Sequence, residues 1–186
     1  MEPDAQSRRV YDEVERHHPV DEIEAHHRDR VLRFLATALR PMDRGVYDPG
    51  HITGSAFVVS ADARQTLLVH HAKLGRWLQP GGHAEVGETD AWQVARREAD
   101  EEVGIRIDAE TGELFDLDVH EIPARGEQPA HLHFDLRYLI VVPQAEGRAG
   151  SEVLAARWFG LSEAEGVVGE AGLRRMIGKV RKRLAD

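Results

Sequence analysis

The chain has 186 residues, of which 41% are hydrophobic and 31% are charged, a composition typical of a soluble globular protein. Its formal net charge of -9 argues against broad binding to nucleic acid or to anionic membranes, and the lack of cysteine excludes disulfides and thiolate chemistry. No apolar run is long enough to span a bilayer, and the N-terminal residues contain no hydrophobic signal core, so we expect a cytoplasmic protein.

The N-terminal part of the chain, residues 1–50, is expected to form a helical hairpin packed on the rest of the protein. Apolar residues recur there near helical spacing, namely Ile23, Val31, Leu32, Phe34, Leu35 and Leu39. This part alone would bury too little apolar surface to fold by itself. Residues 51–186 are therefore expected to form the main domain, with residues 1–50 as an extension.

The pattern changes after residue 50, where short apolar segments are bounded by turn residues. These segments predict strands at residues 51–60, 65–71, 113–123, 130–142 and 153–159. Helices are expected at about residues 90–103 and at the C-terminus. This order predicts an α/β/α sandwich with a mixed sheet between layers of helices.

The helix expected over about Asp90 to Val103 carries signals at both ends. Asp90 can act as N-cap with Gln93 three residues later, which is the arrangement of a capping box. Gly104 can supply the left-handed residue that ends the helix. Trp92 and every third or fourth residue after it form the predicted buried face.

Three glutamates, Glu98, Glu101 and Glu102, occupy the last turns of this helix and share one face. Each like-charge neighbour costs roughly 0.2–0.5 kcal/mol, and each acid opposes the helix dipole by roughly 0.3–1 kcal/mol. A bound divalent cation would relieve this conflict, and oxygen ligands favour Mg²⁺ or Mn²⁺. The alternative is a solvated acidic face that is partly offset by Arg96 and Arg97.

The stretch from Gly82 to Ile105 resembles the Nudix box. That motif has Gly, five residues, Glu, seven residues, then Arg-Glu-aliphatic-any-Glu-Glu-any-Gly-aliphatic. Gly82 and Glu88 match its first half, and the run beginning at Arg97 matches its second half, but eight residues separate Glu88 from Arg97. We expect the extra residue in the loop before Asp90; a bulge inside the helix is the alternative.

Resemblance to the Nudix hydrolases implies their α/β/α fold and metal-dependent hydrolysis of a nucleoside diphosphate linked to another moiety. ADP-ribose, dinucleoside polyphosphates and nucleoside triphosphates are the substrate classes it implies. Metal ions polarise phosphoryl oxygens and lower the pKa of an attacking water, so catalysis rests on positioning and electrostatics. Dimers are frequent among similar proteins, which leaves a homodimer open.

The same resemblance assigns roles to box residues. It implies metal ligation by Glu98, Glu101 and Glu102, with the carbonyl of Gly81 as a further ligand. Arg97 is similar to the arginine that pairs with a box carboxylate, here expected to be Glu88, to hold the loop against the helix. Together with Gly82 and Gly104, Glu88 is expected to have a structural role.

The general base is left between two glutamates. Glu152 lies in the loop before the last predicted strand and is the first candidate, and Glu98 is the second. An exposed loop acid without a catalytic role is the alternative for Glu152.

Substrate contacts are expected from Arg76 and His83, which flank the box glycines, and from His131, His133 and Arg137. The last three share the polar face of the strand predicted at 130–142 and are suited to phosphate or a nucleotide edge. A solvent-facing strand would show the same alternation. The 11 histidines of the chain show no recognisable zinc spacing.

Two other functions remain open. An isopentenyl diphosphate isomerase-like enzyme shares the fold, but such an isomerase relies on a catalytic cysteine that this chain lacks. A nucleotide sensor without turnover is the other, and the complete set of box glutamates argues against it.

Overall fold

The computed structural model describes residues 5–72, 74–143 and 153–185. Its elements are α1 (Ala5–Arg16), α2 (Glu22–Leu35), β1 (Gly50–Ser60), β2 (Gln65–His71), β3 (Arg76–Leu78), β4 (Gly81–His83), α3 (Ala91–Val103), β5 (Glu113–Ile122), β6 (His131–Val142), β7 (Val153–Gly160), α4 (Leu161–Val167) and α5 (Ala171–Ala185). The predicted order of helices and strands is confirmed. β3, β4 and α4 are not among the predicted strands and helices.

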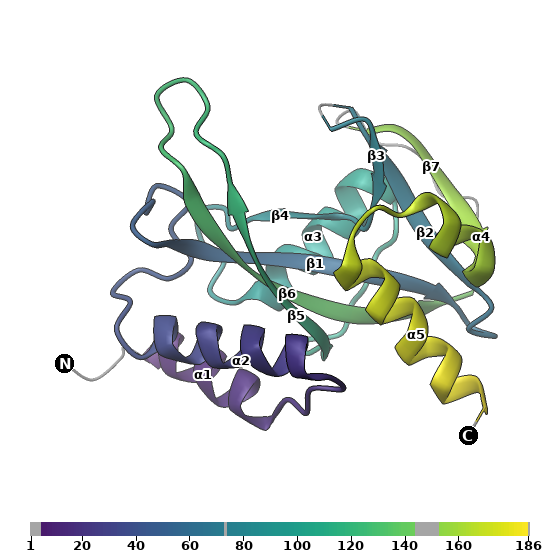
Figure 1. The fold of residues 1–186 in the computed structure, drawn as a ribbon, viewed down its shortest axis with the longest axis horizontal. Helices are drawn as coiled ribbons and strands as arrows, with labels where there is room; N and C mark the ends of the chain where they lie inside the picture. Colours follow the sequence, from purple (N-terminus) through teal and green to yellow (C-terminus); the bar gives the residue numbers. More distant parts are fainter. Residues whose placement is uncertain (1–4, 73, 144–152, 186) are drawn as a thin grey trace.

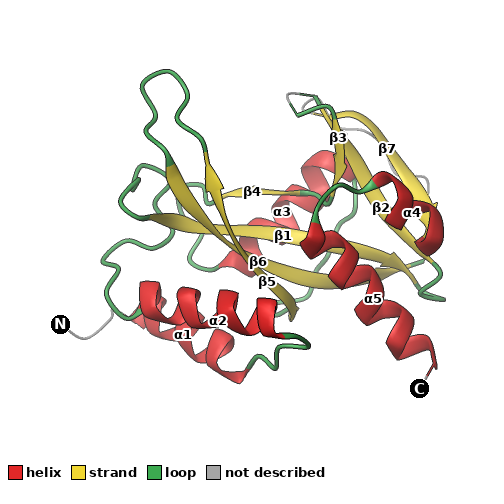
Figure 2. Ribbon diagram, in the orientation of Figure 1, coloured by secondary structure: helices red, strands yellow, loops and turns green. Residues whose placement is uncertain are grey.

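The strands form one mixed sheet in the order β3–β2–β1–β6–β5, with β4 paired to β1 and β7 paired to β2. β1 and β6 are parallel neighbours, and the other strand pairs are antiparallel. α3 lies behind the sheet and α5 in front of it in the view of Figure 1, and Figure 2 shows the same layers by element type. The predicted α/β/α sandwich is thereby confirmed.

Strand β1 divides the apolar core between the two faces of the sheet. Ile52, Ala56 and Val58 belong to a cluster that includes residues of α1, α2 and α3. Phe57 and Val59 belong to a second cluster with residues of α4 and α5. Because successive side chains of a strand point to opposite faces, this long buried strand anchors both layers of helices.

The helices α1 and α2 lie side by side in Figure 1, and α2 contacts β5. The predicted apolar face of α2 is confirmed at Val31, Phe34 and Leu35, which are buried. It is wrong at Ile23 and Leu39, which are exposed. α2 ends at Leu35, so Leu39 lies beyond the helical face, while Ile23 occupies the open first turn. Within the described part of the chain, no helix is both long and apolar enough to cross a membrane.

A buried carboxylate in α2 connects the N-terminal helices to the end of the chain. Glu24 accepts hydrogen bonds from His17 at 2.7 Å, from the backbone amide of Val20 at 2.9 Å and from Lys179 of α5. Burial alone would raise the pKa of Glu24, but these hydrogen bonds lower it to about 2. The ionised form of Glu24 therefore stabilises the packing of α2 on α5.

We expect the Glu24→Gln variant to lose less stability than the wild type as the pH falls. A carboxylate whose folded pKa is about 2, against an ordinary 4.5, contributes stability above pH 4.5 that is lost as the pH falls from 4.5 towards 2. Urea unfolding at a series of pH values over this interval measures the effect as a shallower pH dependence in the variant. Glu22→Gln, at an exposed position of the same helix, is the control. Identical pH dependence for Glu24→Gln and the wild type would contradict the prediction.

Candidate functional site

Both ends of α3 form as the sequence predicts. The side chain of Asp90 accepts a hydrogen bond from the backbone amide of Gln93 at 2.9 Å, and Gly104 ends the helix in the left-handed conformation at φ 71°. The helix between them has no interruption. The extra residue between Glu88 and Arg97 therefore lies in the loop before Asp90, as expected, and the alternative of a helical bulge is wrong.

Gly54 of β1 allows α3 to lie close against the sheet. A Cβ atom at this position would lie 2.2 Å from the carbonyl oxygen of Ala91 and 2.8 Å from Cβ of Val94. Both atoms belong to the start of α3 and have no flexible end that could move aside. The absence of a side chain at Gly54 thus sets the distance between α3 and β1.

Gly54→Ala is expected to destabilise the protein by roughly 1–3 kcal/mol, because the added methyl group forces α3 away from β1. Gly178→Ala is the control, since it adds a methyl group to α5 with nothing within 4 Å. That substitution is expected to stabilise the helix by roughly 0.5–1 kcal/mol. Urea unfolding measures both changes. Equal effects of the two substitutions would show that Gly54 does not limit the packing of α3.

The side chain of Arg97 contacts three glutamates beside α3. Nε of Arg97 lies 3.0 Å from Glu88, and its Nη1 lies 2.9 Å from Glu98 and 2.8 Å from Glu101. Nη2 donates a hydrogen bond to the carbonyl oxygen of His83 at 2.8 Å. Burial alone would lower the pKa of Arg97, but the neighbouring carboxylates raise it above its ordinary value. Arg97 thus offsets much of the repulsion between the glutamates.

Glu102 and Glu98 lie next to strand β4. The backbone amide of Gly81 donates to Oε2 of Glu102 at 3.3 Å, and Glu102 is buried. A Cβ atom at Gly82 would lie 2.1 Å from Oε1 of Glu98. Because Gly82 has no side chain, the backbone of β4 lies close to the carboxylate of Glu98 in α3.

The substrate residues predicted on β6 and β4 belong partly to a cluster of histidines. Nε2 of His133 lies 3.2 Å from Nε2 of His83 and 3.3 Å from Nε2 of His131. Burial lowers the pKa of His83 to about 4 and that of His133 to about 2, with further lowering by neighbouring histidines. These rings are therefore neutral near pH 7.

The sequence reasoning missed a further member of this cluster, His51 at the start of β1. Its ring lies 4.9–5.1 Å from those of His83, His131 and His133. His51 is paired in register with His133, because β1 and β6 are parallel neighbours. Sequence spacing gave no signal for this contact. The histidines show no recognisable zinc spacing along the chain, but the fold brings candidate ligand atoms of His51, His131 and His133 within 4.8 Å of one another.

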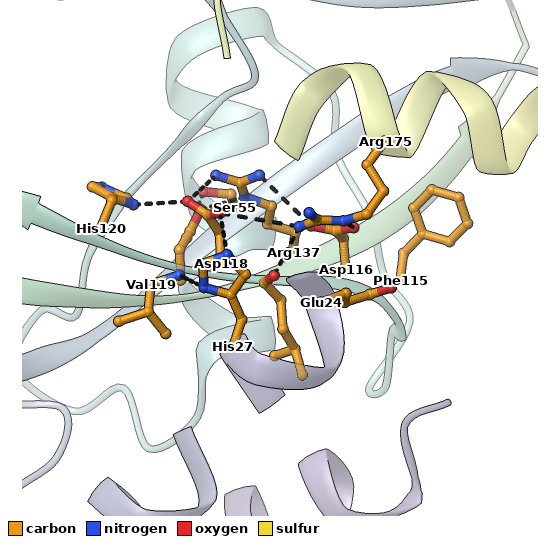
Figure 3. A network of polar contacts seen from close by, with 12 residues as sticks. Glu24, His27, Ser55, Phe115, Asp116, Asp118, Val119, His120, Arg137 and Arg175 are labelled. Carbon is orange, nitrogen blue, oxygen red and sulfur yellow. Dashed lines mark hydrogen bonds and ion pairs between the residues drawn. The ribbon is translucent and has the colours of Figure 1, made fainter. Parts of the chain in front are cut away.

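Arg137 lies in a buried network of charges, with 1% of its surface exposed. Its Nε donates to Asp135 at 2.7 Å and its Nη2 to Asp118 at 3.1 Å, and Nη1 lies 3.7 Å from Asp116. Asp116 also accepts two hydrogen bonds at 2.8 Å from Arg175 of α5, and Figure 3 shows Asp116, Asp118, Arg137 and Arg175 close together. The polar face of β6 is buried here, so the predicted alternative of a solvent-facing strand is wrong.

Two predicted site residues, Arg76 and Glu152, are not placed with the glutamates around Arg97 or with the histidine cluster. Arg76 is exposed on β3, which pairs with β2 and not with β4. Glu152, the first candidate for the general base, lies outside the described residues. Trp77, next to Arg76, is partly buried against the second apolar cluster, and its ring lies 4.8 Å from that of Phe159.

Residues 51–177 match the family model of the NUDIX domain. No curated protein matches the chain. A structure of the dihydroneopterin triphosphate pyrophosphohydrolase of E. coli is similar, with 23% sequence identity and a TM-score of 0.58 over 69% of this chain and 92% of the other. A MutT NUDIX hydrolase from Burkholderia pseudomallei has 25% identity and a TM-score of 0.54 over 69% of this chain and 96% of its own.

The NUDIX domain of Shewanella oneidensis NrtR, in complex with ADP ribose, is also similar. Its identity is 18% and its TM-score 0.55, and the match covers 82% of this chain and 97% of that domain.

Proposed function

We propose that this chain, which belongs to the NUDIX domain family and is a pyrophosphohydrolase, hydrolyses a nucleoside diphosphate linked to another moiety with Mg²⁺ or Mn²⁺ as its cofactor. The observation that carries the proposal is the convergence of Glu98 and Glu102 of α3 on the glycine backbone of β4, with Glu101 beside them on Arg97. In the reaction, water adds to one phosphorus atom and the bridging oxygen leaves with the other phosphoryl group.

The residues fit a hard divalent cation. Glu98, Glu101, Glu102 and the carbonyl of Gly81 offer only oxygen donors, which is the set that Mg²⁺ and Mn²⁺ prefer. Gly82 leaves room at Oε1 of Glu98 that a side chain would fill. When bound, the cation would polarise the phosphoryl oxygens and neutralise charge that develops during cleavage.

The protein residues have separate roles in this proposal. Arg97 positions Glu88, Glu98 and the carbonyl of His83, and so holds the loop before α3 against β4. Glu98 or Glu152 takes the proton from the attacking water. Single-turnover kinetics of Glu152→Gln and of Glu98→Gln distinguish these two candidates for the base.

Substrate contacts are proposed for Arg76, His83, His131, His133 and Arg137. His83, His131 and His133 lie close together, because His83 of β4 is next to the face of the sheet that carries the other two. Arg137 already pairs with three aspartates, so a role in binding requires it to leave some of them. The same proposal divides the chain into an extension of residues 1–50 and a hydrolase domain of residues 51–186. It also includes a cytoplasmic location and a homodimer.

A substrate panel tests this function. The full chain is incubated with ADP-ribose, dinucleoside polyphosphates, nucleoside triphosphates and isopentenyl diphosphate, each with Mg²⁺, with Mn²⁺ and with EDTA. We expect metal-dependent release of a nucleoside monophosphate or pyrophosphate from one nucleotide class. Isomerisation of isopentenyl diphosphate, or binding of nucleotides without turnover of any substrate, would contradict the proposal.

A further inference from the structure

Four histidines of β1, β4 and β6 lie together on one face of the sheet, and the ring of His120 on β5 lies 5.5 Å from that of His133. His51 comes from β1, His83 from β4, and His131 and His133 from β6. We propose that His51, His131 and His133 bind a transition-metal ion, with Zn²⁺ as the expected metal and His83 as the fourth ligand. This site is separate from the oxygen ligands on α3.

Backbone carbonyl groups determine which nitrogen carries the proton in two of these rings. Nδ1 of His51 lies 2.8 Å from the carbonyl oxygen of Val46, and Nδ1 of His131 lies 2.9 Å from that of Pro129. Because a carbonyl oxygen only accepts hydrogen bonds, Nδ1 carries the proton in both rings. Nε2 of each ring is therefore a lone-pair donor directed into the cluster, and histidines that bind metals are held in this way.

The distances between the Nε2 atoms suit tetrahedral coordination. Ligand nitrogens lie about 2.0–2.1 Å from Zn²⁺, which places neighbouring nitrogens of a tetrahedron about 3.3–3.4 Å apart. The two distances at Nε2 of His133 are 3.2 Å to His83 and 3.3 Å to His131. The candidate ligand atoms of His51, His131 and His133 all lie within 4.8 Å of one another.

Hydrogen bonding among the rings explains the cluster less well than a metal. His51 is 1% exposed, and its Nε2 has no hydrogen-bond partner among the described residues. Nε2 of His133 can carry one proton, which it would have to share between His83 and His131. A buried lone pair on His51 would remain in every such arrangement, and a buried polar atom without a partner destabilises the fold.

The imidazole nitrogen ligands also indicate which metal ion would bind. Imidazole nitrogen suits Zn²⁺, Cu²⁺ and Ni²⁺, whereas Mg²⁺ prefers oxygen. The two sites are connected through His83, because its ring is in the cluster while its carbonyl oxygen accepts a hydrogen bond from Arg97. Tyr47 covers the cluster from the loop before β1, with its ring 5.0 Å from that of His131.

Cobalt binding tests this proposal independently of hydrolysis. The full chain is prepared without a histidine tag, stripped with EDTA and titrated with Co²⁺ in the presence of saturating Mg²⁺. We expect the intense visible absorption of tetrahedral Co²⁺, saturating at one ion per chain, and its loss on addition of one equivalent of Zn²⁺. Oxygen ligands on α3 would give only the weak absorption of octahedral Co²⁺.

Matched variants locate the ion. His51→Ala and His133→Ala are expected to lose the visible absorption, while His18→Ala, which changes an exposed histidine between α1 and α2, is expected to keep it. Glu101→Gln is also expected to keep it, even if hydrolysis is lost, which separates this proposal from the function proposed above. Circular dichroism checks that each variant is folded.

Two results would overturn the proposal. The first is wild-type protein that takes up no Zn²⁺ in competition with a chromophoric chelator, a measurement that needs no variant. The second is tetrahedral Co²⁺ absorption that persists in folded His51→Ala and His133→Ala. Zinc uptake by the wild type that is lost in His51→Asn, a substitution of smaller volume change, supports it if the alanine variants do not fold.

Discussion

Glu102→Gln is expected to lower kcat by about 100-fold or more at saturating Mg²⁺, equivalent to about 3 kcal/mol of transition-state stabilisation. The amide removes the negative charge of a proposed metal ligand but keeps an oxygen that can accept the hydrogen bond from Gly81, found at 3.3 Å. The fold is therefore expected to persist. Steady-state kinetics on the best substrate of the panel measure the effect, with circular dichroism as the check on folding.

Glu101→Gln is expected to act in the same direction, because Glu101 lies on the same side of α3 and shares Arg97 with Glu98. Asp100→Asn is the matched control. Asp100 also lies in the last turns of α3, but it pairs with Arg106 at 3.2 Å and not with Arg97. Near-normal activity in both glutamine variants would show that the proposed metal site is wrong.

Arg137→Met is expected to destabilise the protein by about 3–5 kcal/mol, because it leaves buried aspartates without their shared counter-charge. Asp135 and Asp118 each lose a hydrogen bond to the guanidinium, and Asp116 keeps Arg175. Methionine has a similar length and is apolar, so the loss of charge dominates over the loss of packing. Urea unfolding at pH 7 measures the change.

Arg183→Met is the control for this experiment. Arg183 also pairs with a carboxylate, that of Glu113, but both side chains are half exposed. Its loss is expected to cost about 1 kcal/mol or less. If Arg137→Met instead keeps wild-type stability and raises KM for the best substrate, the network is not the main role of Arg137 and the predicted role in substrate binding is favoured.

Much of α3 and its loop could be predicted because the determining interactions are local. The N-cap at Asp90, the left-handed Gly104 and the buried Trp92 follow from residues a few positions apart. The same locality explains why the extra residue lies before Asp90. A loop accommodates one more residue at little cost, whereas a helix interior would have to break its hydrogen-bond pattern.

The neighbours of the strand residues could not be predicted, because pairing between β1 and β6 joins residues about eighty positions apart. His51 lies opposite His133 only because these two strands are parallel neighbours in this register. Arg137 is buried only because Asp116 and Asp118 of β5 and Arg175 of α5 surround it. Alternation along β6 predicted which residues share a face and left open what covers that face.

The sequence by itself determined the family, the acidic helix and its caps, since these depend on spacing along one segment. The tertiary structure decided where the charges are neutralised and which histidines meet. Arg97 holds Glu88, Glu98 and Glu101 together, so the acidic turn is stabilised by the protein as well as by any cation. Long-range strand pairing creates the histidine cluster, because it brings His51 of β1 and His83 of β4 beside the pair on β6.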